Sequence, residues 1–295
     1  NNHVLFLEDV NKEYGEKTVL DNIDLAVSEN EFCILVGHSG CGKSTLLRLI
    51  LGQEKISSGR IIMQGKEIFS PSPERGIVYQ KYSLFPHLTV LENIMIGKQL
   101  PLPFWKGIFI KKAARKEAMH YLESVQLAEH AEKYPYQLSG GMQQRVAIVQ
   151  ALIKKPKIML MDEPFGALDP GTREVMQVLI LQLWKEHNMT IFFVTHDLEE
   201  AVFLGTRILV LSQYYTDGRS NDKKIKRGAK IVADYPLKKQ PSSTKIKESG
   251  EFGRFIQKIR YDGFDPEKLQ HVTQFNLEHS DSFQTLTDDE KKICR

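Results

Sequence analysis

The stretch Gly37-His38-Ser39-Gly40-Cys41-Gly42-Lys43-Ser44-Thr45 decides the fold of this 295-residue chain. It fits the pattern G-x-x-x-x-G-K-[ST]. An apolar run, residues 32–36, comes directly before it, and the residues after it place apolar side chains at helical spacing, at Leu46, Leu47, Leu49 and Ile50. The stretch is therefore predicted to be the turn between a buried strand and a helix.

This pattern is typical of a phosphate-binding loop, or P-loop. Glycines allow backbone N–H groups to close around an anion, Lys43 reaches terminal phosphates, and the Ser44 hydroxyl can coordinate Mg²⁺. A glycine turn with an unrelated lysine is the alternative, and the flanking strand and helix disfavour it. The predicted nucleotide-binding residues of the loop are Gly37, His38, Ser39, Gly40, Cys41, Gly42, Lys43, Ser44 and Thr45. The loop by itself indicates only that a nucleoside triphosphate binds, so the reaction depends on other residues.

The composition and charge of the chain limit which kinds of molecule it is expected to bind. Hydrophobic residues make up 41% of the chain and charged residues 26%, as in an ordinary globular protein. The net charge of +3 is too close to balance to indicate a nucleic-acid partner. The cysteines, Cys33, Cys41 and Cys294, show no metal-ligand spacing, which favours a reducing cytosol. No window approaches the ~18 consecutive apolar residues of a spanning helix, so we expect the chain not to cross a membrane by itself.

Adjacent carboxylates follow a strand with an entirely apolar interior. Residues 158–161 are predicted to lie in the centre of a parallel sheet, and Asp162 and Glu163 come next. Two carboxylates at the carboxyl end of a buried strand cost free energy, so we expect them to have a function. In P-loop enzymes such an aspartate helps to hold Mg²⁺, and the neighbouring carboxylate can polarise the attacking water.

Two other predicted strands also end in polar residues. Gln80 ends the strand that begins near residue 76, and His196 follows the strand at residues 190–195. Active-site groups often lie at the carboxyl ends of parallel strands. A single histidine there is more often structural, but the convergence of three polar strand ends favours a functional His196.

A helical region at residues 81–153 interrupts the strands and contains Leu138-Ser139-Gly140-Gly141. Ser139 is a plausible N-cap for the helix at residues 142–152, and a glycine pair at a helix N-terminus can bind an anion. Taken alone this signal is weak. Asp169, ahead of a predicted helix at residues 172–187, has the role of a helix cap as its simplest interpretation.

Tyr14 lies in a polar stretch, residues 11–17, that we expect to be the loop between strands at residues 4–7 and 20–27. A tyrosine in a turn usually packs on a neighbour. One placed ahead of a P-loop can instead stack on a purine.

Taken together, these motifs resemble the nucleotide-binding subunit of an ATP-binding cassette (ABC) transporter, and the resemblance covers residues 4–236. The residues that carry it are Tyr14, Gly37 to Thr45, Gln80, Leu138 to Gly141, Leu160 to Pro164, Ala167 to Asp169, and His196. The signature departs from the commonest form at Met142, where glutamine is usual; its serine and glycines are intact.

The resemblance implies an α/β fold with a P-loop NTPase core. The core is a mostly parallel sheet flanked by helices with an antiparallel β subdomain, and a helical signature subdomain is added at residues 81–153. The ATPase domain is expected over residues 1–239.

The resemblance also implies a role for each motif. Tyr14 stacks on adenine, while Ser44, Gln80 and Asp162 hold Mg²⁺. Glu163 is the catalytic base, assisted by Lys43, Gln80 and the switch histidine His196. Ser139, Gly140, Gly141 and Asp169 contact ATP that is bound by the other subunit of a head-to-tail dimer.

The cofactors implied are ATP and Mg²⁺. The implied partners are a second copy of the chain or a homologous ATPase subunit, transmembrane permease subunits, and a solute-binding protein, with a peripheral location on the cytoplasmic face of the membrane. The loop sequence, Leu84 to Thr89, Met142 and Phe165 to Asp169 are most similar to importers of nitrate, sulfonates, taurine and bicarbonate. An exporter subunit or a non-transport ABC regulator is the alternative.

The chain continues beyond this resemblance, with a C-terminal extension at residues 240–295. A strand at residues 207–211 and a strand-like segment at 229–233 read as a hairpin with a basic loop, residues 214–227. After a linker at residues 241–243, helices are predicted from Phe252, Phe255, Ile256 and Ile259, from a start at residues 265–267, and from a capping box at residues 287–290. The extension either packs on its own domain or binds a partner subunit or regulator.

Overall fold

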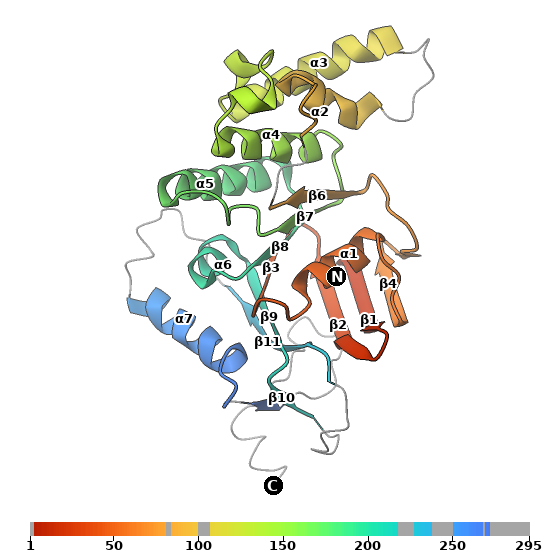
Figure 1. The fold of residues 1–295 in the computed structure, drawn as a ribbon, viewed down its shortest axis with the longest axis vertical. Coiled ribbons are helices and arrows are strands. Elements are labelled where there is room, and N and C mark those ends of the chain that lie inside the picture. The colour runs from red at the N-terminus through yellow and green to blue at the C-terminus, as the bar shows by residue number, and fades with distance from the viewer. Residues whose placement is uncertain are drawn as a thin grey trace. The chain divides into compact units, whose positions relative to one another are not determined.

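The computed structural model describes residues 3–80, 84–99, 107–217, 227–237, 250–267 and 269–271. It divides into two compact units. Figure 1 colours the chain by residue number, from red at the N-terminus to blue at the C-terminus. The first unit comprises Asn1–Ser72 and Thr190–Arg295, and the second comprises Pro73–Met189. Each is described by itself.

The core of the first unit is a set of buried strands. Strands β11 (Lys230–Pro236), β9 (Arg207–Ser212), β3 (Phe32–Gly37) and β8 (Ile191–Thr195) are neighbours in that order. β3 is parallel to both β8 and β9, and every residue of β3 and β8 is buried. Apolar runs of this kind suit strands that are covered on both faces. β11 is antiparallel to β9, which is the hairpin that the sequence predicts.

An antiparallel sheet completes the first unit, in the order β2-β1-β4-β5. Its strands are β1 (His3–Tyr14), β2 (Lys17–Ser28), β4 (Ser58–Met63) and β5 (Lys66–Glu67). The prediction of a loop at residues 11–17 was wrong, because Glu13 pairs with Thr18 and Tyr14 with Lys17. The backbones of β1 and β2 stay paired up to Tyr14 and Lys17, although the side chains at this end of the two strands are mostly exposed. The hydrophobic pattern of the sequence therefore does not reveal that these residues are in strands.

The second unit combines a pair of parallel strands with helices. β6 (Arg75–Tyr79) pairs with β7 (Ile158–Asp162). The helices are α2 (Val90–Gln99), α3 (Gly107–Ser124), α4 (Gly140–Leu152) and α5 (Pro170–His187), with short 3₁₀ turns at Ala128–His130 and Pro135–Gln137. α2, α3 and α4 pack on one another. The residues at the carboxyl ends of these strands, Gln80, Asp162 and Glu163, are polar, and α4 packs on β6.

The C-terminal segment contributes helix α7 (Gly250–Gly263), which contacts α6 (Leu198–Leu204), β9 and β11 (Figure 1). A helix starting at Asp265 was a wrong prediction. The Asp265 carboxylate accepts from the Glu267 backbone N–H instead, and β12 (Gln270–His271) pairs in parallel with β10 (Tyr215–Thr216). A short side-chain turn followed by strand pairing replaces the expected helix.

The linker at residues 241–243, the capping box at 287–290, and most of the basic loop lie outside the described residues.

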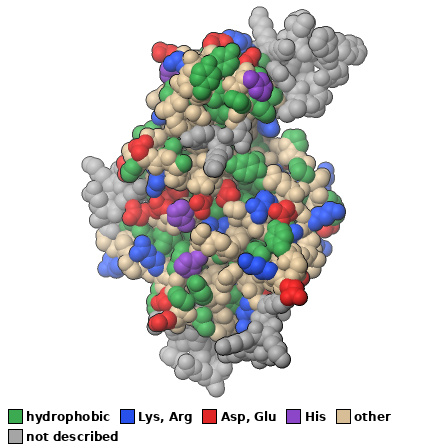
Figure 2. All heavy atoms as spheres, in the orientation of Figure 1, with side chains coloured by type: hydrophobic (Ala, Val, Ile, Leu, Met, Phe, Trp, Pro, Cys, Tyr) green, Lys and Arg blue, Asp and Glu red, His purple; other side chains and the backbone are tan. Residues whose placement is uncertain are grey.

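On the face drawn in Figure 2, acidic and basic side chains are intermingled within each part of the surface. Within the described ranges, none of the helices combines the length and apolarity that a membrane crossing requires.

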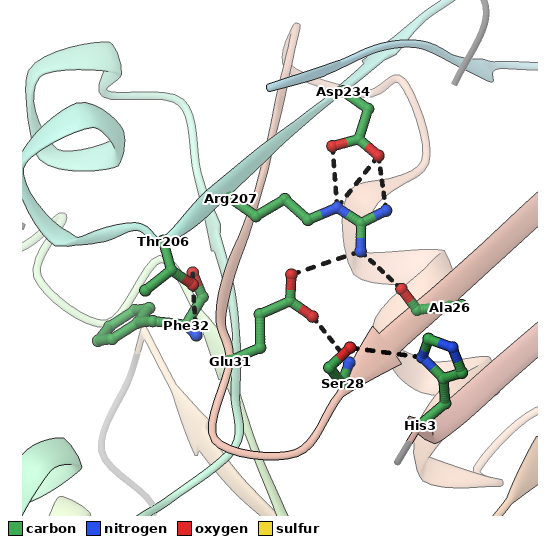
Figure 3. A network of polar contacts seen from close by, with 8 residues as sticks. All are labelled: His3, Ala26, Ser28, Glu31, Phe32, Thr206, Arg207 and Asp234. Atoms are coloured by element: carbon green, nitrogen blue, oxygen red, sulfur yellow. Dashed lines mark hydrogen bonds and ion pairs between the residues drawn. The ribbon is translucent and has the colours of Figure 1, made fainter. Parts of the chain in front are cut away.

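A buried ion network joins the two sheets of the first unit (Figure 3). The Arg207 guanidinium donates to both carboxylate oxygens of Asp234, at 2.6 to 3.1 Å. It also donates to the Ala26 carbonyl at 2.7 Å and to a carboxylate oxygen of Glu31 at 3.4 Å. The three charged side chains are only 6 to 13% exposed. Burial raises the pKa of Glu31, and the guanidinium opposes that rise.

Arg207→Met is expected to lower the free energy of unfolding by about 3–5 kcal/mol, because it leaves two buried carboxylates without their cation. Arg60→Met is the matched control. Arg60 pairs with Glu8 at the surface, where the two side chains are 56% and 36% exposed, so its loss should leave the free energy of unfolding nearly unchanged. Urea unfolding of the two variants measures both values. Equal effects would contradict a structural role for the Arg207 network.

Candidate functional site

The phosphate-binding loop lies in the first unit between β3 and α1 (Lys43–Leu51). Gly40 and Gly42 have φ of 78° and 108°, a region that favours glycine. A Cβ on Gly37 would lie 2.4 Å from the Leu211 carbonyl oxygen, so only glycine allows this approach to β9. Glycine is therefore favoured at Gly40 and Gly42 by a positive φ, and is required at Gly37 by the close approach to β9.

Lys43 begins α1 and folds back over the loop. Its ammonium group donates to the carbonyl oxygens of Gly37, at 2.8 Å, and His38, at 2.9 Å, and the residue is only 5% exposed. No acidic residue lies in the first turn of α1. Burial raises the pKa of the Cys41 thiol, which keeps that side chain neutral. A cation and a helix N-terminus without nearby negative charge fit a bound phosphate.

Tyr14 is linked to α1 through Glu54. The Tyr14 hydroxyl donates to the Glu54 carboxylate, which also accepts from the Arg48 guanidinium at 2.5 Å. The Lys12 ammonium lies 4.6 Å from the centre of the tyrosine ring. Burial and the bond to Glu54 raise the pKa of Tyr14, so its hydroxyl stays protonated. The residue remains 45% exposed, which leaves ring surface for a base to stack on.

His196 follows β8 at the same sheet edge as the loop. Thr195, the last residue of β8, pairs with Val36, so the chain positions of His196 and Gly37 correspond. Asp197 caps α6 by accepting from the N–H groups of Glu199 and Glu200. A cleft of about 920 Å³ lies here, lined by residues 196–199 and by residues of α7 and the turn after it. The exposed His196 thus faces space that a ligand can enter.

In the second unit, Gln80 and the two carboxylates come together. Tyr79 pairs with Asp162 across β6 and β7, so Gln80 and Glu163 are the next residues on neighbouring strands. The Gln80 side chain also reaches the turn after β7, where its amide nitrogen lies 3.1 Å from the position of a Cβ on Gly166. The polar strand ends predicted for this unit are therefore neighbours.

Glu163 has a strained backbone. Its φ is 46°, in the left-handed region that few residues other than glycine adopt. The turn is closed by a hydrogen bond from the Gly166 N–H to the Glu163 carbonyl, at 3.1 Å. Strain at a carboxylate beside a buried strand is a feature of functional positions.

The signature motif begins α4, where Ser139 is the N-cap and its hydroxyl accepts from the Met142 N–H at 3.4 Å. A Cβ on Gly141 would lie 2.4 Å from the Thr172 methyl group, so α4 packs tightly on the start of α5. Asp169 caps α5 by accepting from the Thr172 N–H at 3.0 Å. Hydrogen bonds from Thr172 lower the pKa of the Asp169 carboxyl. Thr172 therefore joins the signature and the Asp169 turn.

The structure also reveals residues that the motifs did not indicate. Glu54, in the turn after α1, and Arg48 of α1 support Tyr14, and Thr172 links two motifs. Phe264 accepts a hydrogen bond from the loop residue His38. Phe264 is 226 positions from His38, and nothing in the residues around either one indicates that they are in contact.

Comparison with known proteins shows the family of the chain. Residues 20–166 match the family described as ABC transporter. The chain is 42% identical to the bicarbonate transport ATP-binding protein CmpD of Synechococcus elongatus over 212 residues, 70% of this chain and 75% of that protein. It is 45% identical to an aliphatic sulfonates import ATP-binding protein of Burkholderia cenocepacia over 207 residues, 70% of this chain and 60% of that protein.

A solved structure shares the fold. The cbiO1 protein of Clostridium perfringens, part of an ABC transporter complex, superposes with a TM-score of 0.68 at 24% identity, covering 88% of this chain and 95% of that one. The predicted α/β P-loop fold is therefore confirmed.

Proposed function

Because the chain belongs to the ABC transporter family, whose ATP-binding proteins are ATPases, we propose that it is the ATP-hydrolysing subunit of an importer. The solute is a small anion, of the class of bicarbonate, nitrate or a sulfonate. The observation that carries this proposal is the 42–45% identity to proteins named for bicarbonate transport and sulfonate import.

The hydrolytic chemistry is divided among the motifs. Lys43 and the N-terminus of α1 neutralise phosphate charge, and Tyr14 holds the base. Glu163 accepts a proton from the attacking water, and His196 helps to hold that water. Ser44, Gln80 and Asp162 supply the oxygen ligands that Mg²⁺ prefers, and the ion would offset the charge of the β- and γ-phosphates.

The complete site needs two ATPase subunits, either two copies of this chain or a homologous partner. In this proposal Ser139, Gly140, Gly141 and Asp169 of one subunit contact the ATP held by the loop of the other, head to tail. The start of α4 has no acidic residue in its first turn, which suits an anion. ATP joins the subunits and hydrolysis releases them.

Exposed aromatic residues of the second unit are candidate contacts for the membrane subunits. Tyr134 and Tyr136 stack with ring centres 5.7 Å apart and are 37% and 75% exposed, and Phe85 is 42% exposed. Backbone hydrogen bonds from Val90 and Leu91 to residues 133 and 131 join the segments that carry them. Large exposed aromatics often mark interaction surfaces. In this proposal the subunit is peripheral, on the cytoplasmic face of its permease.

Reconstitution tests the importer proposal. The chain is placed in proteoliposomes with its cognate permease and solute-binding protein, and labelled bicarbonate, nitrate and an alkyl sulfonate are supplied on the binding-protein side. We expect one anion to accumulate, dependent on ATP and on the binding protein, and to raise ATPase activity. The Glu163→Gln chain is the inactive control. Transport towards the opposite side would indicate an exporter, and ATPase activity that no permease alters would indicate a regulator.

A further inference from the structure

Within the first unit, the C-terminal helix α7 packs on β9, β11 and α6. Phe252, Ile256 and Ile259 are buried at 6%, 8% and 0% exposure. A Cβ on Gly263 would lie 2.0 Å from a methyl group of Val210, so the end of α7 touches β9 directly. Tyr235 of β11 donates a hydrogen bond to Asp262, which fixes the last turn from a second strand. The position of Phe264, the next residue after α7, is therefore determined by the sheet.

Phe264 in turn contacts the phosphate-binding loop. The His38 Nε2 lies 3.0 Å from the Phe264 carbonyl oxygen, and since a carbonyl only accepts, Nε2 carries the proton. The two rings are 4.6 Å apart, and Tyr214 lies edge-on to His38 at 5.4 Å. The histidine is thus enclosed by two aromatic residues and hydrogen-bonded across 226 positions of sequence.

His38 also holds Lys43, through its backbone carbonyl. The His38 carbonyl oxygen accepts from the Lys43 ammonium at 2.9 Å, and also from the Cys41 N–H at 3.3 Å. The side chain of His38 is therefore fixed by the tail, while its backbone fixes Lys43. His38 thus connects the residue after α7 to Lys43.

We propose that His38 is a positioning residue for ATP binding, through which the C-terminal segment holds the phosphate-binding loop in its binding conformation. The inference rests on the proposed nucleotide site, and it assigns a task to a part of the chain beyond the ABC motifs. A loop that is already in its bound conformation loses less conformational entropy when ATP binds, so the contact raises affinity and leaves the chemical step alone.

The test compares His38→Ala with His38→Gln. One hydrogen bond contributes about 1 kcal/mol, so we expect His38→Ala to raise the Kd for ATP about fivefold. Glutamine can donate from a similar position, so His38→Gln should restore the Kd to within about twofold of the parent. Calorimetric titration with ATP gives the Kd of each variant. Arg254→Ala, an exposed position on α7, is the control and should match the parent.

A second variant moves the tail without touching the loop. Gly263→Ala places a methyl group against the stiff, buried Val210 and should displace the end of α7. We expect the same rise in Kd as for His38→Ala, and no further rise in the double variant, because both remove one contact.

Three results would overturn the positioning role: an unchanged Kd for His38→Ala, failure of glutamine to restore it, or additive effects of the two substitutions. If the parent chain itself bound no ATP, the proposed function would fail instead, so the two failures are distinguishable.

Discussion

Glu163→Gln is expected to lower the ATP hydrolysis rate by about 10²–10⁴-fold while leaving ATP affinity within about twofold. The amide keeps the size of the carboxylate and cannot accept a proton from water. The left-handed φ of 46° at this residue costs free energy, and such strain is often found at functional sites. Steady-state phosphate release and nucleotide titration measure the two quantities.

Glu174→Gln, on the exposed side of α5, is the matched control and should retain the parent rate. A Glu163→Gln variant that hydrolysed ATP at close to the parent rate would show that another group is the base.

Lys43→Ala should weaken ATP binding by about 10²-fold or more, equal to about 2.7 kcal/mol. A charge-assisted bond to phosphate accounts for most of this loss. The rest follows from the loop itself, because the ammonium group also holds the carbonyls of Gly37 and His38. Calorimetric titration with ATP gives the affinity.

Lys66→Ala, an exposed lysine of β5, controls for loss of positive charge and should bind normally. Thermal unfolding without nucleotide separates a disordered loop from a lost phosphate contact. Unchanged ATP affinity in a folded Lys43→Ala chain would contradict the assignment of the phosphate-binding loop.

Local features of this protein are predictable from the sequence where a few neighbouring residues are enough to produce them. The glycines of the loop, Ser139 as an N-cap and Asp169 as an N-cap all act within a few residues, and the structure has them as predicted. Apolar runs likewise located β3, β7 and β8, because burial on both faces requires an uninterrupted pattern.

Features that depend on distant contacts were not predictable. The polar residues 11–14 form strand because β2 pairs with them, and residues 270–271 form strand because β10 does. The same holds for His38, whose partner Phe264 is set by the docking of α7. Each outcome is decided by tertiary pairing, which leaves no periodicity in the sequence.

In the proposed function two ATPase subunits share their ATP sites, and sedimentation velocity of the Glu163→Gln chain tests this sharing most directly. Without nucleotide the chain should sediment as a monomer, and with ATP and Mg²⁺ as a dimer, because the trapped nucleotide joins the loop of one copy to the Ser139 motif of the other. Adding Ser139→Arg should abolish the dimer while ATP still binds. A Glu163→Gln chain that binds ATP and Mg²⁺ yet remains a monomer at all concentrations would contradict a site shared between two copies of this chain.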